Sequence, residues 1–315
     1  MTGNQLRNRV GLLLWLILML APCGQAMGGS GVAVLLSDSL ESYQEPVATF
    51  GEEIGLPMTL YNLHGDLNGV SELRQQIFNN KPDLILAVGA KAAYAAKLWT
   101  QDRQEIPVLF IMVINWQRYK LLDGQRNITG IAMETGAGTQ LANMAMFTPK
   151  ARRIGVIYSL AFRQSFEQAQ QAAKLIGLEI IGIEIDSAKE FQRAFKGLAD
   201  QVDGFWMLND PQVFTLDNVD WFRARCIKDH LVCIGEAEEM ARTGLLLSIS
   251  PDHQNIGSQA ASVVMNILQH HQRPQEIGVM DPISTHISVN LATAAKLGMD
   301  VRQLPLEMAF RVYEE

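Results

Sequence analysis

Short apolar runs alternate with helical stripes along most of this chain. Residues 31–36 and 83–88 are apolar at nearly every position, as expected for parallel strands covered on both faces. Between such runs, Val47, Phe50 and Ile54 recur at intervals of three and four, which predicts a helix with one buried face. The first series of predicted strands covers residues 31–36, 57–63, 83–88 and 107–114.

A second series of the same kind begins after residue 120. Helical stripes separate its strands, and the last long stripe runs from Ile256 to Ile267. Strict alternation of strand and helix calls for parallel strands joined by right-handed crossovers. We therefore predict an α/β protein with two similar sheets. The predicted strands of the second series cover residues 128–133, 154–158, 178–185, 202–208, 231–235 and 245–249.

The first 26 residues do not follow this alternation. Arg7 and Arg9 precede an apolar run from 10 to 21, and small residues follow it up to Ala26. A membrane-spanning helix needs about 20 apolar residues, so this run is too short for a secure anchor. A basic start, a short apolar centre and small residues are typical of a secretory signal peptide. We predict cleavage after Ala26 and export to the periplasm, with an uncleaved anchor or a lipid on Cys23 as the alternatives.

Composition and charge narrow the classes of partner. The chain has 315 residues, 48% of them hydrophobic, which is enough to fill two cores. Its net charge is −7, and loss of the signal segment would remove two arginines and no acidic residue. Nucleic acids and anionic membranes bind basic surfaces, so neither is an expected partner.

Two cysteines, Cys226 and Cys233, would remain after export, and an oxidising compartment could join them. However, Cys226 lies at helical spacing with Val219 and Phe222, and Cys233 lies inside an apolar run. Because free cysteine behaves as a small buried hydrophobe, two free thiols are favoured over a disulfide. Neither is interpreted as a nucleophile.

Motifs for catalysis and for cofactors are missing from the sequence. There is no glycine–lysine phosphate loop, no HExxH, no CxxC and no GxSxG. Gly136 and Gly138 begin a dinucleotide fingerprint, but Leu141 occupies the third glycine position. None of the six histidines pairs with a carboxylate or cysteine at ligand spacing. We therefore predict no enzyme activity, no cofactor and no metal site.

Residues at the ends of the predicted strands are the candidates for a ligand site. In open parallel sheets, ligands bind outside the carboxyl ends of the strands, near helix N-termini. Ser, Asp and Asn also cap helices and form turns, so each polar candidate has a structural alternative. Two facing sheets with polar strand ends predict a cleft that closes over a small molecule. Trp116 has no capping role, and we interpret its ring as a wall of this cleft, with packing under a loop as the alternative. The candidates are Ser37, Asp38, Ser39, Ala90, Lys91, Asn115, Trp116, Tyr158, Ser159, Asn209, Asp210, Glu236, Ser250 and Asp252.

Several short segments resemble those of one known family in their residues, their order along the chain and their spacing. The chain is similar to the ABC-transporter substrate-binding proteins of the tryptophan/tyrosine-type group, which have the type I periplasmic-binding-protein fold. The likeness covers nearly all of the chain after the signal segment. It is carried by residues 81–89 (KPDLILAVG), 106–110 (IPVLF), 127–131 (NITGI), 153–158 (RIGVIY), 244–248 (GLLLS), 289–291 (VNL) and 295–298 (AKLG), together with Asp252 and Gly257.

The resemblance implies two Rossmann-like lobes with parallel sheets, joined by three crossing strands and closing on a ligand by hinge motion. The crossings would lie near residues 120–130, 245–252 and 280–290. Lobe 1 would comprise residues 31–122 plus 250–280. Lobe 2 would comprise residues 123–249 plus 281–315.

Individual positions carry over from the family to this chain. Asp252 matches an acidic position at the end of a crossing strand, where it could hold an amino group. Asp210 matches another acid after a lobe-2 strand, and Ser165 matches a polar helix-start position that family members often fill with serine.

Departures from the family pattern bear on the ligand. The family's Thr after the third strand is replaced by Ala90, and its Asp-Pro after the fourth strand by Asn115-Trp116. Loss of a polar contact can reject a ligand strongly, which argues against an ordinary aromatic amino acid. Arg163 is a candidate replacement partner for a carboxylate, with a solvated helix-start arginine as the alternative.

For function, the resemblance implies an exported solute-binding protein that captures an amino-acid-like molecule or a small carboxylate between its lobes. Its partner would be an ABC permease, and we expect the protein itself to be a monomer. The alternative is an extracytoplasmic sensing module that reports to a membrane sensor protein.

Overall fold

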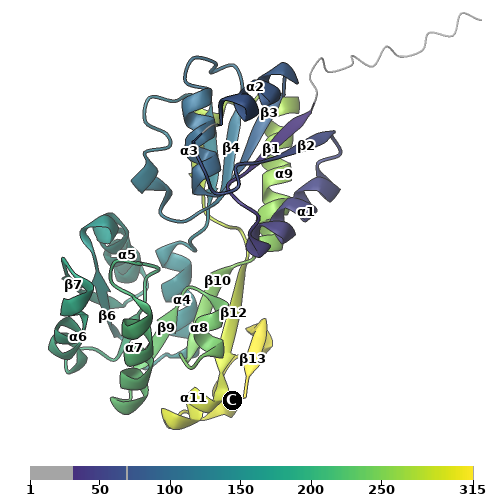
Figure 1. The fold of residues 1–315 in the computed structure, drawn as a ribbon. Coiled ribbons are helices and arrows are strands. Elements are labelled where there is room, and N and C mark those ends of the chain that lie inside the picture. The colour runs from purple at the N-terminus through teal and green to yellow at the C-terminus, as the bar shows by residue number, and fades with distance from the viewer. Residues whose placement is uncertain (1–30, 69, 315) are drawn as a thin grey trace, which may run out of the picture.

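The computed structural model describes residues 31–314 apart from Gly69, and it folds them around two separate sheets (Figure 1). The predicted signal segment, residues 1–26 with Cys23, lies outside the described residues. Every helix among the described residues is too short or too polar to span a bilayer.

Lobe 1, residues 31–132 and 253–280, is built on a six-stranded sheet with the order β11-β5-β4-β3-β1-β2. All of its strand pairs are parallel. Its strands are β1 (Val32–Leu36), β2 (Met58–Asn62), β3 (Leu84–Val88), β4 (Val108–Val113), β5 (Ile128–Ala132) and β11 (Val279–Met280). Its helices are η1 (Glu41–Tyr43), α1 (Gln44–Glu53), α2 (Ser71–Asn79), α3 (Ala90–Trp99), η2 (Trp116–Tyr119), α9 (His253–Gln269) and α10 (Pro274–Ile277).

Helices cover both faces of the first sheet. Leu84 and Leu86 of β3 pack with α1 and α9 on one face, whereas Ile85 and Ala87 pack with α2 and α3 on the other (Figure 1). Successive side chains of a strand point to opposite faces, so a strand covered on both sides must be apolar throughout. This geometry explains the continuous apolar runs in the sequence.

Lobe 2, residues 137–251 and 285–314, is built on a seven-stranded sheet with the order β13-β12-β10-β9-β8-β6-β7. Its strands are β6 (Arg153–Tyr158), β7 (Glu179–Glu184), β8 (Gly204–Trp206), β9 (Val232–Gly235), β10 (Leu247–Pro251), β12 (Thr285–Asn290) and β13 (Arg311–Tyr313). Its helices are α4 (Ala137–Phe147), η3 (Leu160–Phe162), α5 (Arg163–Leu175), η4 (Ala188–Glu190), α6 (Phe191–Ala199), α7 (Leu216–Lys228), α8 (Glu238–Arg242), α11 (Leu291–Lys296), η5 (Val301–Gln303) and η6 (Leu306–Met308).

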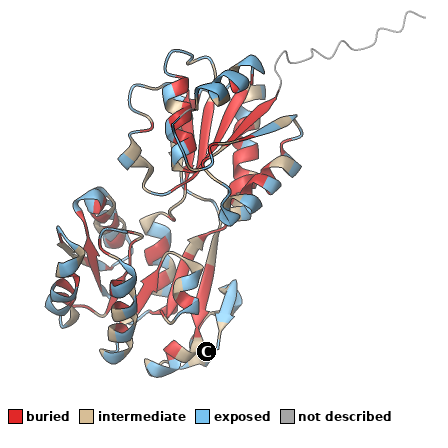
Figure 2. Ribbon diagram, viewed as in Figure 1, coloured by how far each residue is buried: buried red, intermediate tan, exposed pale blue. Residues whose placement is uncertain are grey.

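The second sheet is also covered on both faces. Helices α4, α5 and α11 contribute to the core on one face, and α6 and α7 to the core on the other. Figure 2 shows the inner strands of both lobes as buried, and the edge strand β13 and the outward sides of the helices as mostly exposed. Each lobe therefore has its own core, as the two predicted series of strands and helices require.

One strand pair departs from the predicted parallel arrangement. β10 pairs with β12 in antiparallel register, with Leu247 opposite Val289 and Ser250 opposite His286. The chain leaves lobe 2 along β10 and returns to it along β12, so these neighbours must run in opposite directions. The sheet of lobe 2 is therefore parallel except at this pair.

Three segments cross between the lobes: residues 133–136 between β5 and α4, residue 252 between β10 and α9, and residues 281–284 between β11 and β12. The first crossing comes later than the expected 120–130. β5 pairs with β4 and β11 in the first sheet, so the expected start of lobe 2 at residue 123 is too early. The apolar run of β5 belongs to lobe 1 because its hydrogen-bonding partners do.

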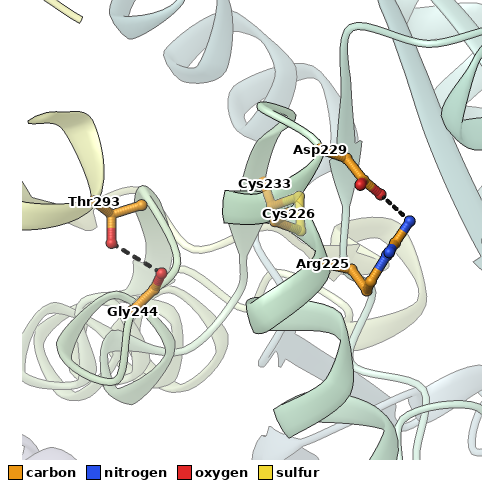
Figure 3. The surroundings of a disulfide bond; sticks show 6 residues. All are labelled: Arg225, Cys226, Asp229, Cys233, Gly244 and Thr293. Carbon is orange, nitrogen blue, oxygen red and sulfur yellow. Dashed lines mark hydrogen bonds and ion pairs between the residues drawn. A yellow bond between two sulfur atoms is a disulfide. The ribbon is translucent and has the colours of Figure 1, made fainter. Parts of the chain in front are cut away.

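A disulfide joins Cys226 in the last turn of α7 to Cys233 in β9 (Figure 3). The prediction of two free thiols is wrong. The helix ends at Lys228, and a tight turn leads into β9, which brings the two Cα atoms to 6.1 Å. Arg225 and Asp229 form an ion pair of 2.6 Å beside this turn. Both cysteines are as buried as predicted, at 3% and 1% exposed, and the bond links a helix to a central strand of lobe 2.

We predict that the double substitution C226A/C233A lowers the free energy of unfolding by about 2–3 kcal/mol, because the unfolded chain loses a short covalent loop. Thermal unfolding measured with and without reductant tests this. The unsubstituted protein should lose stability in dithiothreitol, whereas the variant should be insensitive to it. Equal melting temperatures for the oxidised protein and the variant would contradict the prediction.

Candidate functional site

Two cavities lie between the lobes, next to the crossing segments. The first has a volume of about 110 Å³ and the second about 430 Å³. Both are lined by Glu134, Thr135 and Glu236, so they meet at these three residues. Lobe 1 contributes the turn after β4 to the first cavity, and lobe 2 contributes η3, α5 and β8. A molecule in these cavities would therefore contact both lobes.

Three carboxyl groups line the first cavity: Glu134, Glu236 and Asp281. Each follows the carboxyl end of a parallel strand, β5, β9 or β11. Glu134 accepts a hydrogen bond from the backbone N–H of Asn115, and Glu236 accepts one from Asn209 at 3.2 Å. Strands from different sheets end at the same cavity, which brings together acidic residues that lie far apart in the sequence.

The lack of a side chain at Gly136 leaves room for the Asp281 carboxylate. A Cβ atom at residue 136 would lie 2.5 Å from Oδ2 of Asp281, closer than real Cβ atoms approach. The absent side chain therefore lets the third crossing pack against the first. The glycine that resembled part of a nucleotide fingerprint has this packing role.

Burial and then the nearby charge of Glu134 raise the pKa of Glu236, and with the lowering effect of the Asn209 N–H included this pKa is about 8. The pKa of Glu134 is also raised, first by burial and then by the charge of Asp281. Glu236 is therefore mainly protonated at neutral pH while no positive charge lies beside it.

Two donors or acceptors in this region have no hydrogen-bond partner among the described residues: Nε1 of Trp206 and Oγ1 of Thr135. Their residues are only 3% and 4% exposed, and both line the first cavity. Trp206 lies close enough to Glu236 to lower the pKa of that carboxyl, without a well-formed hydrogen bond. Buried polar groups without partners call for an explanation, and a bound molecule is one.

Acidic side chains can also gather around a metal ion. No group of three or more His, Cys, Asp or Glu residues in the described chain is placed to hold one.

Six residues predicted from strand ends or from the resemblance line the two cavities. Asn115, Trp116 and Ser165 line the first, Asn209 and Ser250 line the second, and Glu236 lines both. The Trp116 ring also contacts Phe110 of β4, at 6.1 Å between ring centroids. A role for these six in ligand binding stays a prediction.

The other lobe-1 candidates line neither interlobe cavity. The Ser37 hydroxyl accepts a hydrogen bond of 2.8 Å from the N–H of Ala92 in α3, and Ser39 accepts one from the Asn62 amide. Asp38 and Ser39 line a separate cavity of about 200 Å³ beside α1 and β2. Lys91 donates to the Gly65 carbonyl, and Ala90 begins α3. The structural alternative therefore accounts for the contacts of Ser37 and Lys91.

In lobe 2, the buried Asp210 connects the segment after β8 to the segment after β6. Its carboxylate accepts the Ser159 N–H at 2.7 Å and the Gln212 N–H at 3.0 Å, and it is 1% exposed. Tyr158 stacks on Phe166 at 4.3 Å in the core of lobe 2. Arg163 is exposed and forms a two-pronged pair with Glu184 at 2.6 and 2.7 Å, so its charge is already paired.

Asp252 forms hydrogen bonds to neighbouring residues of the protein. Its carboxylate caps α9 through the Asn255 N–H at 3.0 Å and accepts from the Asn255 amide at 3.0 Å and the Ser284 hydroxyl at 3.2 Å. Nε2 of His286 lies 3.4 Å away. Hydrogen bonds to Asn255 help hold the pKa of Asp252 below its usual value, against the opposing effect of burial. Asp252 lines neither interlobe cavity, so these contacts give it a structural role.

The sequence did not point to several cavity residues. Glu134, Thr135 and Asp281 lie in crossing segments, Phe162 ends η3, and Trp206 is the last residue of β8. The available signal was the acidic residue that directly follows the predicted strand 128–133. With a crossing expected near residues 120–130, this acidic residue would lie inside lobe 2 and not between the lobes.

Comparison with known proteins identifies relatives over most of the chain. A family model described as "ABC transporter substrate binding protein" matches residues 43–313. A tyrosine-binding protein from Clostridioides difficile (strain R20291) is 22% identical over 245 residues, which cover 76% of this chain and 69% of that protein.

Solved structures share the fold. The ligand-free, open structure of a substrate-binding protein with adhesive properties from Clostridium difficile has a TM-score of 0.73 and 18% identity, and covers 91% of this chain and 100% of its own. An ABC domain in complex with L-Trp from Streptococcus pneumoniae has a TM-score of 0.58 and 20% identity, and covers 89% of this chain and 99% of its own.

The raised pKa of Glu236 predicts a pH dependence of stability. Between the ordinary value of 4.5 and about 8, the folded protein binds a proton that the unfolded chain has released, so this group's contribution falls as the pH rises. We expect thermal unfolding at pH 5 and pH 8 to show a larger loss for the unsubstituted protein than for E236Q. E239Q, at an exposed glutamate nearby, is the control. Equal losses in E236Q and the unsubstituted protein would contradict the prediction.

Proposed function

The chain belongs to the family of ABC transporter substrate-binding proteins, and from this premise we propose that it captures a small solute between its lobes and delivers it to an ABC permease. The observation that carries the proposal is the pair of connected cavities at the carboxyl ends of strands from both sheets. A solute held there would favour closure, because it would contact both lobes at once.

The size and walls of the cavities support a solute of amino-acid size. The first cavity is narrow, with the rings of Trp116, Phe162 and Trp206 among its lining, and the second offers about 430 Å³. A relative is named for tyrosine, and a solved structure of the same fold contains L-Trp. Aromatic walls give a small ligand a large, rigid contact area.

Two features support an extracytoplasmic location. The first 26 residues have the order of a signal peptide, with a basic start, a short apolar run and small residues. The buried Cys226–Cys233 disulfide is of a kind that persists in oxidising compartments and is rare in the cytosol. Export to the periplasm brings the protein to the face of the membrane where a permease would accept its ligand.

We predict that a panel of amino acids, amines and small carboxylates contains at least one compound that raises the melting temperature of the protein. A ligand at 100 times its Kd stabilises the folded state by about 2.7 kcal/mol. W116A should weaken the binding at least tenfold, because it removes a wall of the first cavity. R118A, at an exposed position in the same turn, should bind as the unsubstituted protein does. No thermal shift with any compound would contradict the proposal.

The proposed delivery to a permease leads to a separate prediction. Cells that lack this protein should lose uptake of the identified solute, and uptake should return with the unsubstituted protein but not with W116A. Uptake that persists without the protein, together with loss of a response to the solute, would favour the sensing alternative over transport.

A further inference from the structure

Three hydrogen-bond acceptors meet where the two cavities join. They are the carboxyl groups of Glu134 and Glu236 and the hydroxyl of Thr135. Thr135 is 4% exposed, and its oxygen has no hydrogen-bond partner among the described residues. A primary ammonium group has three N–H donors and one positive charge. The number of acceptors and their charge therefore match a primary ammonium group.

The described part of the chain offers no positively charged side chain to a carboxylate in the first cavity. None of the described residues that line the first cavity is lysine or arginine, and Asp281 adds a third acidic side chain. Arg311 lines the second cavity, but its guanidinium lies 3.4 Å from the Glu238 carboxylate. A ligand carboxylate attached next to the ammonium would face Glu134 and Glu236 across a short distance, and like charges that close repel strongly.

Aromatic rings line the first cavity beside these acidic residues. Trp116 from lobe 1 and Phe162 and Trp206 from lobe 2 line the first cavity together with the acidic residues. Aromatic faces attract organic cations, and the attraction is greater where water is excluded. The rings and the carboxyl groups thus favour the same class of ligand by two independent effects.

We propose that the ligand is a primary organic amine without a carboxylate, and that its ammonium group binds to Glu134, Thr135 and Glu236 while its apolar part lies against the rings. This proposal rests on the proposed solute-binding function and narrows its ligand class.

A proton is coupled to this binding. In the free protein Glu236 is mainly protonated, since burial and the charge of Glu134 raise its pKa to about 8, and an ammonium beside it would favour the ionised form. In the first cavity the charged neighbours of Glu236 are Glu134 and Asp281. In the second the charged or titratable neighbours are Glu45, Glu238, His253, His286 and Arg311. An amine should therefore displace a proton and bind more tightly as the pH rises from 6 to 8.

Matched ligands that differ only in one group test the proposal. Calorimetric titration compares tryptamine with L-tryptophan and indole-3-propionate, and tyramine with L-tyrosine. We expect at least one amine to bind ten times more tightly than its amino acid, and the acid without an amine not to bind. E134Q and E236Q should each weaken amine binding at least tenfold, E239Q should not, and E236Q should also remove the pH dependence and the proton release.

The outcomes separate this inference from the function on which it rests. If an amino acid binds as tightly as its amine, or if the carboxylic acid binds, the amine proposal fails and solute binding stands. If E134Q and E236Q bind amines as the unsubstituted protein does, the assigned acceptors are wrong. If neither these ligands nor the wider panel binds, both proposals fail.

Discussion

A half-buried carboxyl group between two lobes, close to a second carboxyl group, is the constraint on which the chemistry of this protein depends. Ionising Glu236 there is costly, because burial removes water and Glu134 adds a like charge. The folded protein meets that cost by keeping a proton on the group. The fold creates the situation by ending β5 and β9, from different sheets, at the same cavity. A proton and a cationic ligand therefore compete for the same oxygen atoms.

Much of the fold could be predicted from the sequence because its strands are covered on both faces. A run such as Leu84–Val88 must be apolar throughout, and that pattern is visible without any knowledge of the rest of the chain. The return of the chain along β12 is not visible in the apolar pattern, because Thr285 and His286 interrupt it and the antiparallel pairing depends on β10; only the family resemblance implied a crossing there. Likewise, the approach of Cys226 to Cys233 depends on how α7 packs against β9, which the apolar pattern does not show.

The candidate site was only partly predictable, for a related reason. Asn115, Trp116 and Glu236 follow strands and line the cavities, as the rule for parallel sheets suggests. Asp210 and Asp252 satisfy the same rule, yet their oxygens accept hydrogen bonds from neighbouring backbone groups. In the sequence, an acidic residue that caps a helix after a strand cannot be distinguished from one that faces a cavity. Residues of the crossing segments, such as Glu134 and Asp281, are recognised only once strand pairing shows where the crossings lie.

The contacts of Asp252 have a consequence for the geometry of closure. Asp252 stands in the second crossing and accepts from Ser284 in the third, and both lie beside the β10–β12 pair. Gly136 of the first crossing lies against Asp281 of the third, so all three crossings are in contact with their neighbours. A movement of one lobe against the other must therefore bend the three crossings together at this place, whereas sliding of the lobes past each other would break the contacts between the crossings.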